Sequence, residues 1–193
     1  LCADGHYGYS QPVGGVIAYE EQVAPSGVGY DIACGNKAVR TNLKYEDIRE
    51  DLPNIMDAVA SRISFGIGRK NKERIDHALF EDDGWYVYRQ FGQQEHDILK
   101  KLAYEQLGTV GAGNHFVDIF VEEATGDVWI ANHFGSRGFG HKTASGFLNV
   151  AAGRQFLDRA PGESMEQLPS LLNLNEELGQ LYMEAMRLAG VYA

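Results

Sequence analysis

Asp31 and Cys34, a carboxylate and a thiol three positions apart in a glycine-rich stretch, are the first residues of this chain that could carry out chemistry together. Both side chains can converge on one cation, and a thiolate can also bridge two metal ions. An isolated pair of this kind leaves another interpretation open, in which Cys34 is a small buried residue and Asp31 belongs to a turn. The pair indicates a metal site only if further ligands join it.

Two histidines are candidates for those ligands. His115 begins one expected strand and His133 ends the next, and residues 122–126 between them have the composition of a hairpin turn. Antiparallel pairing about that turn places the histidines roughly opposite each other, where cross-strand Cβ atoms are about 5 Å apart. Two imidazoles at that distance could share a metal ion. Either histidine could instead be a hydrogen-bonded residue at a strand end.

Glycine-rich segments flank both histidines, at 108–114 and 135–140. Backbone N–H groups in such segments can approach phosphate oxygens, and Arg137 could hold a phosphate through two hydrogen bonds. Hairpins and helix caps also use glycine, and neither segment is a Walker A motif or a dinucleotide fingerprint. These segments are therefore weak evidence of phosphate binding.

Residues 62–74 contain five basic side chains and a single acid, Glu73; the basic residues are Arg62, Arg69, Lys70, Lys72 and Arg74. They could contact a nucleic-acid backbone, or they could belong to a solvated loop. Three aromatic residues follow downstream, Trp85, Tyr86 and Tyr88. They could stack on nucleic-acid bases, but we expect at least two of them to pack in the core.

The elements expected to position these residues are both strands and helices, which makes the fold class α+β, mixed, with long functional loops. Hydrophobic periodicity predicts strands at 12–19, 36–43, 115–121 and 127–131. It predicts helices at 45–63, starting or kinked at Pro53, and at 94–107, 147–159 and 176–192. No internal repeat is visible.

Composition sets outer limits on function. The 193 residues fit one domain, 44% are hydrophobic and 23% charged, and no run of about 18 apolar residues exists to cross a membrane. Two cysteines cannot form a disulfide framework, which favours a reducing, cytoplasmic location. The net charge of −10 argues against unspecific coating of nucleic acid but leaves a local basic groove possible.

Four motifs then occur in one order: Asp4-Gly-His6-x-Gly8, Pro25-Ser-Gly-Val-Gly-Tyr-Asp-Ile-Ala-Cys-Gly35, Leu107-Gly-Thr-Val-Gly-Ala-Gly-Asn-His-Phe116 and His133-Phe-Gly-Ser-Arg-Gly138. Together they resemble the RtcB family of RNA ligases, and the resemblance covers essentially the whole chain. It implies a mixed α/β fold and a ligase that depends on GTP and two Mn²⁺ ions. The reaction joins an RNA 3′-phosphate or 2′,3′-cyclic phosphate to a 5′-hydroxyl, in tRNA splicing or RNA repair.

The resemblance also implies site residues by motif match. The metal ligands would be Asp31, Cys34, His115 and His133, with Cys34 bridging both ions. Asn114 would contact the guanylate phosphate, and Phe116 and Asp118 lie in the stretch that lines the nucleotide pocket. Arg137 would hold an RNA phosphate, and Asp4 would be a carboxylate near the metals.

The chain departs from the family at several points. Asp118 stands where glutamate is usual, and Phe134 stands where serine is usual. None of the six histidines matches the family's further histidine ligand or its guanylylated histidine, so we expect residues 1–193 to be the N-terminal-to-middle portion of one RtcB-like catalytic domain, inactive alone. The alternatives are a non-catalytic metal- and RNA-binding module and a dinuclear metallophosphodiesterase. An activating protein partner stays an open possibility.

Overall fold

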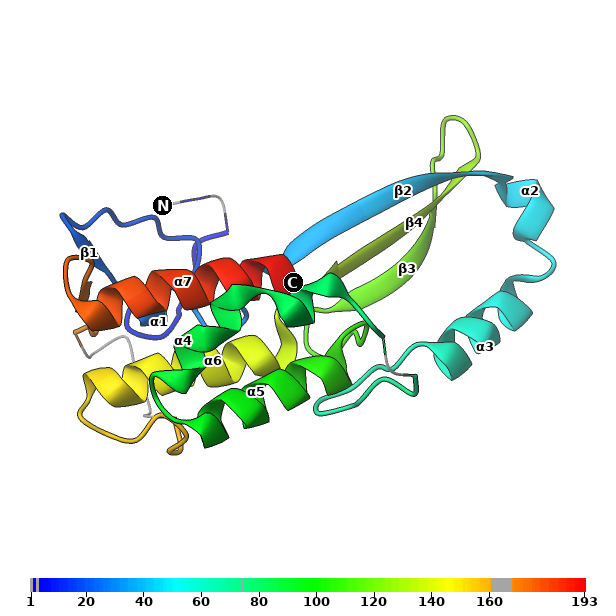
Figure 1. Cartoon of the computed structure of the whole chain (residues 1–193). Coiled ribbons are helices and arrows are strands. Elements are labelled where there is room, and N and C mark those ends of the chain that lie inside the picture. Colours follow the sequence, from blue (N-terminus) through cyan, green and yellow to red (C-terminus); the bar gives the residue numbers. More distant parts are fainter. Residues whose placement is uncertain (1, 3, 74, 161–167) are drawn as a thin grey trace.

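The structure is a computed structural model that describes residues 2, 4–73, 75–160 and 168–193. A bundle of helices forms the body, and a three-stranded sheet extends from it toward two further helices (Figure 1). The helices are α1 Pro25–Val28, α2 Tyr45–Ile48, α3 Leu52–Arg62, α4 Tyr86–Arg89, α5 Gln93–Gln106, α6 Arg137–Ala151 and α7 Glu177–Tyr192, with 3-10 turns at Ala78–Glu81 and Asp83–Trp85. The strands are β1 Gln22–Val23, β2 Gly35–Lys44, β3 Phe116–Val121, β4 Asp127–Phe134 and β5 Leu172–Asn173.

The large sheet has the antiparallel order β2-β4-β3, and a small sheet pairs β1 with β5. The predicted hairpin is confirmed as β3 and β4, but its register differs by one residue from the expected one. His133 pairs with Phe116 on one side and with Asn36 on the other, so it does not stand opposite His115. Because alternate strand residues share a face, Phe116 and Asp118 lie on the same face of the sheet as His133.

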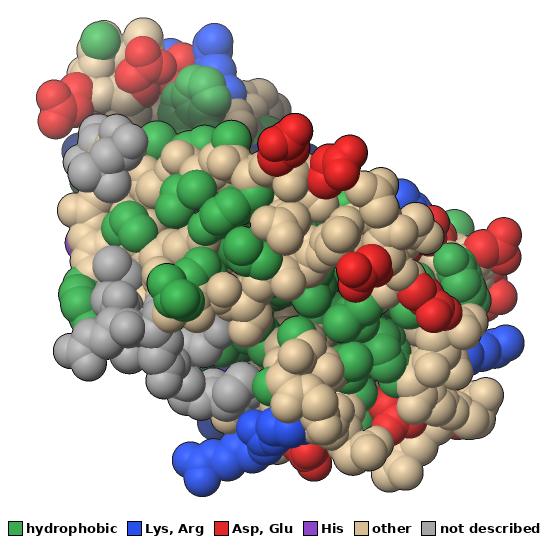
Figure 2. All heavy atoms as spheres, turned by 90° about the vertical axis from the view of Figure 1, so that its left-hand side faces the viewer, with side chains coloured by type: hydrophobic (Ala, Val, Ile, Leu, Met, Phe, Trp, Pro, Cys, Tyr) green, Lys and Arg blue, Asp and Glu red, His purple; other side chains and the backbone are tan. Residues whose placement is uncertain are grey.

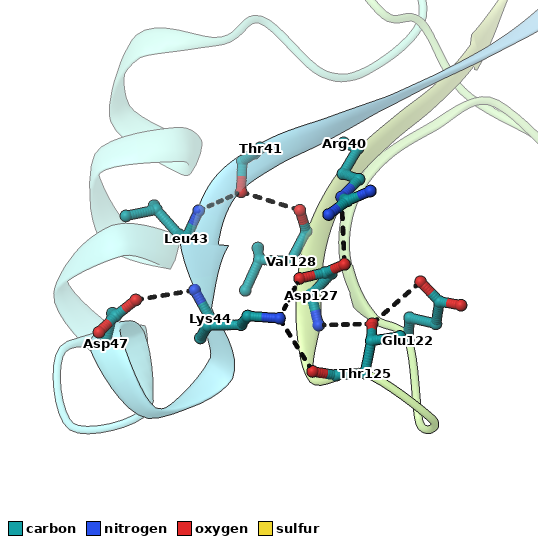
Figure 3. A network of polar contacts seen from close by, with 9 residues as sticks. All are labelled: Arg40, Thr41, Leu43, Lys44, Asp47, Glu122, Thr125, Asp127 and Val128. Carbon is teal, nitrogen blue, oxygen red and sulfur yellow. Dashed lines mark hydrogen bonds and ion pairs between the residues drawn. The ribbon is translucent and has the colours of Figure 1, made fainter.

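Charged side chains gather at the end of the sheet that lies away from the helical body and next to α2 (Figure 3). The side chain of Asp127 is only 7% exposed, and it accepts a hydrogen bond from Lys44 Nζ and forms an ion pair with Arg40 Nε at 3.1 Å. Lys44 Nζ also donates to the Thr125 carbonyl. The Lys44 hydrogen bond is the main cause of the lowered pKa of Asp127, ahead of the Thr125 hydrogen bond and the nearby cations. These contacts join the β3–β4 turn to the end of β2.

The hydrophobic core lies among α4 to α7 and is rich in aromatic side chains: Phe80, Trp85, Tyr88, Phe139, Phe147, Phe156 and Tyr182. Many of these rings meet edge to face, which is a favoured aromatic geometry. Trp85 and Tyr88 are buried while Tyr86 is 44% exposed, so the expectation that at least two of the three pack in the core is confirmed.

The sequence-based elements are confirmed in most places. The predicted helix at 45–63 divides into α2 and α3, and Pro53 lies in the first turn of α3, where a missing N–H costs little. Helices α5 and α7 and strand β2 lie where they were expected. The predicted strand at 12–19 is wrong, because only Val13 forms a β-bridge there, with His6. Gly14 has a φ of +72°, and a Cβ there would lie 2.5 Å from the Asp4 carbonyl oxygen, so the chain turns instead of extending.

The predicted helix at 147–159 is also wrong, because α6 begins ten residues earlier, at Arg137, and ends at Ala151. The glycines that suggested a phosphate-binding loop at 135–140 lie in or beside this helix, where they permit close packing. A Cβ on Gly138 would lie 2.7 Å from the Gln106 side chain, and one on Gly140 would lie 1.8 Å from Ser136 Oγ. Close packing against neighbouring side chains, and not a loop conformation, therefore explains the glycines at these positions of the helix.

Two helical glycines give a matched test of this explanation. A Cβ on Gly146 of α6 would lie 2.2 Å from the ring of Phe156, whereas one on Gly190 of α7 would meet nothing closer than 4.0 Å. We expect Gly146→Ala to destabilise the chain by about 1–3 kcal/mol through overpacking. Gly190→Ala should stabilise it by about 0.5 kcal/mol through helix propensity. Urea denaturation of both variants measures the difference, and equal effects would contradict the packing explanation.

Hydrophobic side chains also gather on the outer surface at the end of the molecule where β1, β5 and the start of α7 lie, with acidic side chains beside them (Figure 2). A hollow of about 240 Å³ at β1 and α1 is lined by Val16, Ile17 and Val28, whose exposed fractions are 81%, 48% and 47%. In the part of the chain that the structure describes, no helix is both long enough and apolar enough to cross a bilayer.

Candidate metal centre

The turn between α1 and β2 brings Asp31 and Cys34 against the end of β4. Ala33 adopts a left-handed conformation with φ 56°, and the backbone N–H of Ser136 donates to the Ile32 carbonyl at 3.2 Å. Gly135 leaves room for this turn, since a Cβ there would lie 2.5 Å from Asp31 Oδ1 and 3.0 Å from the Cα of Cys34. The missing side chain at position 135 therefore allows the predicted Asp/Cys pair to approach the histidines of the hairpin.

The four predicted metal ligands come together. Cys34 Sγ lies 2.9 Å from His133 Nε2 and 3.5 Å from His115 Nε2, and the ligand atoms of these three residues are all within 4.8 Å of one another. Asp31 Oδ2 lies 2.6 Å from His115 Nε2 and so adjoins the group on the His115 side. One thiol, two imidazoles and a carboxylate form a donor set that suits a borderline transition metal. The central position of Cys34 is compatible with a thiolate that bridges two ions.

The contacts of His115 orient its ring for metal binding. Its side chain is 5% exposed, and Nδ1 lies 2.9 Å from the Val110 carbonyl oxygen. When Nδ1 carries the proton and donates to that carbonyl, the lone pair of Nε2 faces Cys34 and Asp31. Metal-binding histidines commonly have such a partner. His133 has none for Nδ1, which is buried without a hydrogen-bond partner among the described residues.

Arg137 begins α6 beside this centre with an unusual φ of 56°. Its Nη1 lies 2.7 Å from His115 Nδ1, and its buried Nε has no hydrogen-bond partner among the described residues. A Cβ on Gly111 would lie 1.6 Å from the guanidinium, so glycine at 111 is what lets Arg137 reach this position. The arginine predicted to hold a phosphate therefore does adjoin the metal ligands.

The environment of Cys34 favours its neutral thiol when no metal is bound. Burial raises the pKa of the thiol to about 11, assisted by a hydrogen bond from the thiol to Asp31 and by the charge of that carboxylate, while the Arg137 guanidinium opposes the shift. A metal ion that binds the thiolate at neutral pH must therefore displace a proton.

The three residues predicted to contact the nucleotide lie beside His133. Asn114 Nδ2 is 3.4 Å from His133 Nε2, and the ring of Phe116 stacks on the His133 ring with centroids 6.0 Å apart. Asp118 is exposed on the same face of β3 as Phe116. The structure thus places Asn114 and Phe116 at the metal centre and Asp118 farther along the same face of β3, and their contacts with a nucleotide stay a prediction.

The structure does not bring Asp4 to the centre. Its carboxylate side chain is 94% exposed and lies 3.3 Å from His6 Nδ1, and among the described contacts no hydrogen bond or ion pair joins it to the four ligands. The predicted role of Asp4 near the metals has no contact to support it here.

The predicted basic strip is partly paired within the chain. Lys70 Nζ forms an ion pair with Glu105 at 2.9 Å, and Lys72 Nζ donates to the Ser61 carbonyl. Arg62 and Arg69 are exposed, and Arg74 lies outside the described residues. This strip is closer to a loop held by its own contacts than to a continuous cationic surface.

Sequence reasoning missed the groups that support the centre: the Val110 carbonyl, Gly111 and Gly135. The two glycines have a sequence signal, their position near a histidine, but that signal is only weak evidence of phosphate binding, and nothing in the sequence marks the Val110 carbonyl. It also missed a cavity of about 460 Å³ beside Asp31 and Arg137, to which Tyr30, His141 and Lys142 contribute.

Comparison with known proteins adds an independent finding. A family model described as tRNA-splicing ligase RtcB matches residues 1–193. The tRNA-splicing ligase RtcB of Aeropyrum pernix is 32% identical in an alignment of 234 positions, gaps included, which covers 98% of this chain and 48% of the relative. The protein of that name from Thermococcus kodakarensis is 32% identical over 98% of the chain and 47% of its own length. The RNA-splicing ligase RtcB of Escherichia coli K12 is 32% identical over 86% of the chain and 41% of its length. The chain spans about half the length of the curated relatives it matches.

Proposed function

The chain belongs to the RtcB family, and from that premise we propose that it carries the metal centre of an RNA ligase. The reaction would join an RNA 3′-phosphate or 2′,3′-cyclic phosphate to a 5′-hydroxyl, using GTP and two Mn²⁺ ions, in tRNA splicing or RNA repair. The observation that carries the proposal is the meeting of Cys34, His115 and His133 within 4.8 Å, although 81 residues separate the cysteine from the first histidine.

The donor set can hold the proposed ions, because the carboxylate is a ligand type that suits Mn²⁺ and the thiolate and neutral imidazoles bind divalent transition metals, zinc more tightly than manganese. Cys34 and His133 would hold one ion, and Asp31, His115 and Cys34 the other. Bound Mn²⁺ would supply charge neutralisation for a transferring phosphoryl group. With metal on Nε2, His115 Nδ1 would carry the proton and could donate it to the Val110 carbonyl oxygen, 2.9 Å away.

The surrounding residues would bind and orient the substrates. The Arg137 guanidinium beside His115 presents further N–H donors that can hold a phosphate through two hydrogen bonds. Asn114, Phe116 and Asp118 would contact the guanine nucleotide, and the proximity of Asn114 and Phe116 to His133 supports this role. Asp118 is one methylene shorter than the glutamate usual in the family, so its carboxylate reaches less far from the strand.

Binding of a short oligoribonucleotide with a 3′-phosphate, measured by fluorescence anisotropy with and without Mn²⁺, tests the proposal. We expect Mn²⁺ to tighten binding at least about tenfold, or ~1.4 kcal/mol, for the 3′-phosphate and not for a 3′-hydroxyl RNA. His133→Ala should abolish that gain, while His77→Ala, which changes an exposed histidine in another part of the chain, should preserve it. Equal binding of both RNAs in Mn²⁺ would contradict the proposal. Cleavage of the RNA would favour the metallophosphodiesterase alternative.

A further inference from the structure

A cavity of about 460 Å³ adjoins the metal centre between the loop around Gly68, helix α5 and helix α6. This volume is in the range of about 300–1,000 Å³ typical of small-ligand sites. Asp31 and Arg137, which contact His115, are part of its wall. A group bound in the cavity would therefore be a direct neighbour of anything held by the metal ligands.

The cavity wall offers an aromatic surface. The rings of Tyr30 and His141 stack with centroids 4.9 Å apart and an interplanar angle of 27°. Tyr9 also meets the Tyr30 ring edge to face, with centroids 5.1 Å apart. His141 is exposed and lines the cavity, so its ring is accessible to a bound group. Partial burial and, to a smaller extent, the charge of Lys142 lower the pKa of His141.

The rest of the wall combines apolar and cationic side chains. Leu102 of α5 and Ile67, which is 90% exposed, supply apolar surface, and Lys142 supplies a positive charge next to His141. A flat ring to stack on, apolar contact for a base and a cation for a phosphate are the features that bind single-stranded nucleic acid without sequence preference. Phe116 and Asp118 do not line this cavity, so it is separate from the position proposed above for GTP.

We propose that this cavity is the subsite for the terminal nucleotide of the RNA strand whose end phosphate lies at the metal centre. The base of that nucleotide stacks on His141, and Lys142 pairs with the phosphate on its 5′ side. Arg137 connects the cavity with the metal ligands and faces the end phosphate. This inference rests on the proposed function, and it predicts that RNA ends are accepted with little regard to base identity.

The test uses the 193-residue chain, Mn²⁺ and a 3′-phosphorylated oligoribonucleotide with the fluorescent base 2-aminopurine at its 3′-terminal position. We expect stacking to quench the fluorescence on binding, and an RNA with the probe four nucleotides inward to be quenched much less. His141→Ala should remove the quenching and weaken binding about tenfold. His141→Phe should restore both, because it keeps an aromatic ring. Lys142→Ala should keep the quenching. It should also make the slope of the logarithm of the association constant against the logarithm of salt concentration shallower by about 0.7.

The outcomes separate this inference from the proposed function. If Mn²⁺ and the 3′-phosphate both tighten binding but His141→Ala changes neither affinity nor quenching, the subsite is wrong and the ligase proposal stands. If quenching depends on His141 while Mn²⁺ and the 3′-phosphate have no effect, the ligase proposal fails. The proposed subsite fails in that case too, because the end phosphate of the bound RNA would then not lie at the metal centre. Failure of His141→Phe to restore binding would also overturn the stacking role.

Discussion

Replacing Cys34 by alanine is expected to lower the affinity of this chain for Mn²⁺ by more than about 100-fold. Loss of a residue that only hydrogen-bonds to a metal ligand costs up to about 100-fold, and loss of a ligand itself should cost more. The reason is the central place of the thiol, whose Sγ lies within 3.5 Å of both histidine Nε2 atoms. Cys2→Ala is the matched control, because Cys2 is also a free, exposed cysteine but has no place in the cluster. Calorimetric titration of the three proteins measures the difference. Equal Mn²⁺ affinity in wild type and Cys34→Ala would remove Cys34 from the metal site.

The same titration has a pH signature. The pKa of the Cys34 thiol is about 11 without metal, so at pH 7 an ion binds by displacing one proton. Below that pKa the apparent affinity should therefore rise with pH, by up to about tenfold per pH unit, and this part of the pH dependence should vanish in Cys34→Ala. Titrations in buffers with different ionisation enthalpies count the proton directly. Zn²⁺ binding as tight as Mn²⁺ binding would not contradict the assignment, since thiolate and imidazole favour zinc.

The metal centre could be predicted from the sequence because half of it is built by a local element. His115 and His133 belong to one hairpin, and the turn residues between them fix which strand ends meet. The sequence places the histidines only roughly opposite each other, because the exact register depends on the turn's own hydrogen bonds. Gly126 N–H donates to the Glu122 carbonyl, and Glu122 N–H donates to that of Asp127, which pairs Phe116 with His133. The rings of the two histidines still lie 5.4 Å apart, so the chemistry was unaffected.

The other half depends on contacts between distant segments, which periodicity does not report. Glycine at 135 admits the Asp31 turn, and glycine at 111 admits the Arg137 guanidinium, yet in the sequence both look like ordinary loop glycines. The start of α6 was missed for the same reason. Its glycines have low helix propensity, and only the neighbouring side chains, such as Gln106 and Phe156, explain their presence.

Incubation of this 193-residue chain with labelled GTP and Mn²⁺ is expected to give no covalent guanylate adduct. Transfer of a guanylate to histidine needs a neutral imidazole nitrogen in line with the α-phosphate, and positioning supplies much of the rate of such reactions. His115 and His133 direct Nε2 at Cys34 and are occupied by metal in the proposed function. His96 is buried in α5 beside Asp97, and the ring of His141 is stacked on Tyr30.

His6 is the histidine whose surroundings best fit a nucleophile, since it lies beside Asp4 in one of the four motifs quoted above. Both side chains are largely exposed, and the described contacts of His6 do not reach the metal ligands, so an in-line position would require the segment around it to move. Mass spectrometry after incubation detects an acid-labile phosphoramidate directly. His6→Ala and His77→Ala form the matched pair, because both remove an exposed imidazole. An adduct that His6→Ala abolishes and His77→Ala preserves would show that these residues carry the nucleophile themselves, and that the chain is an enzyme in its own right.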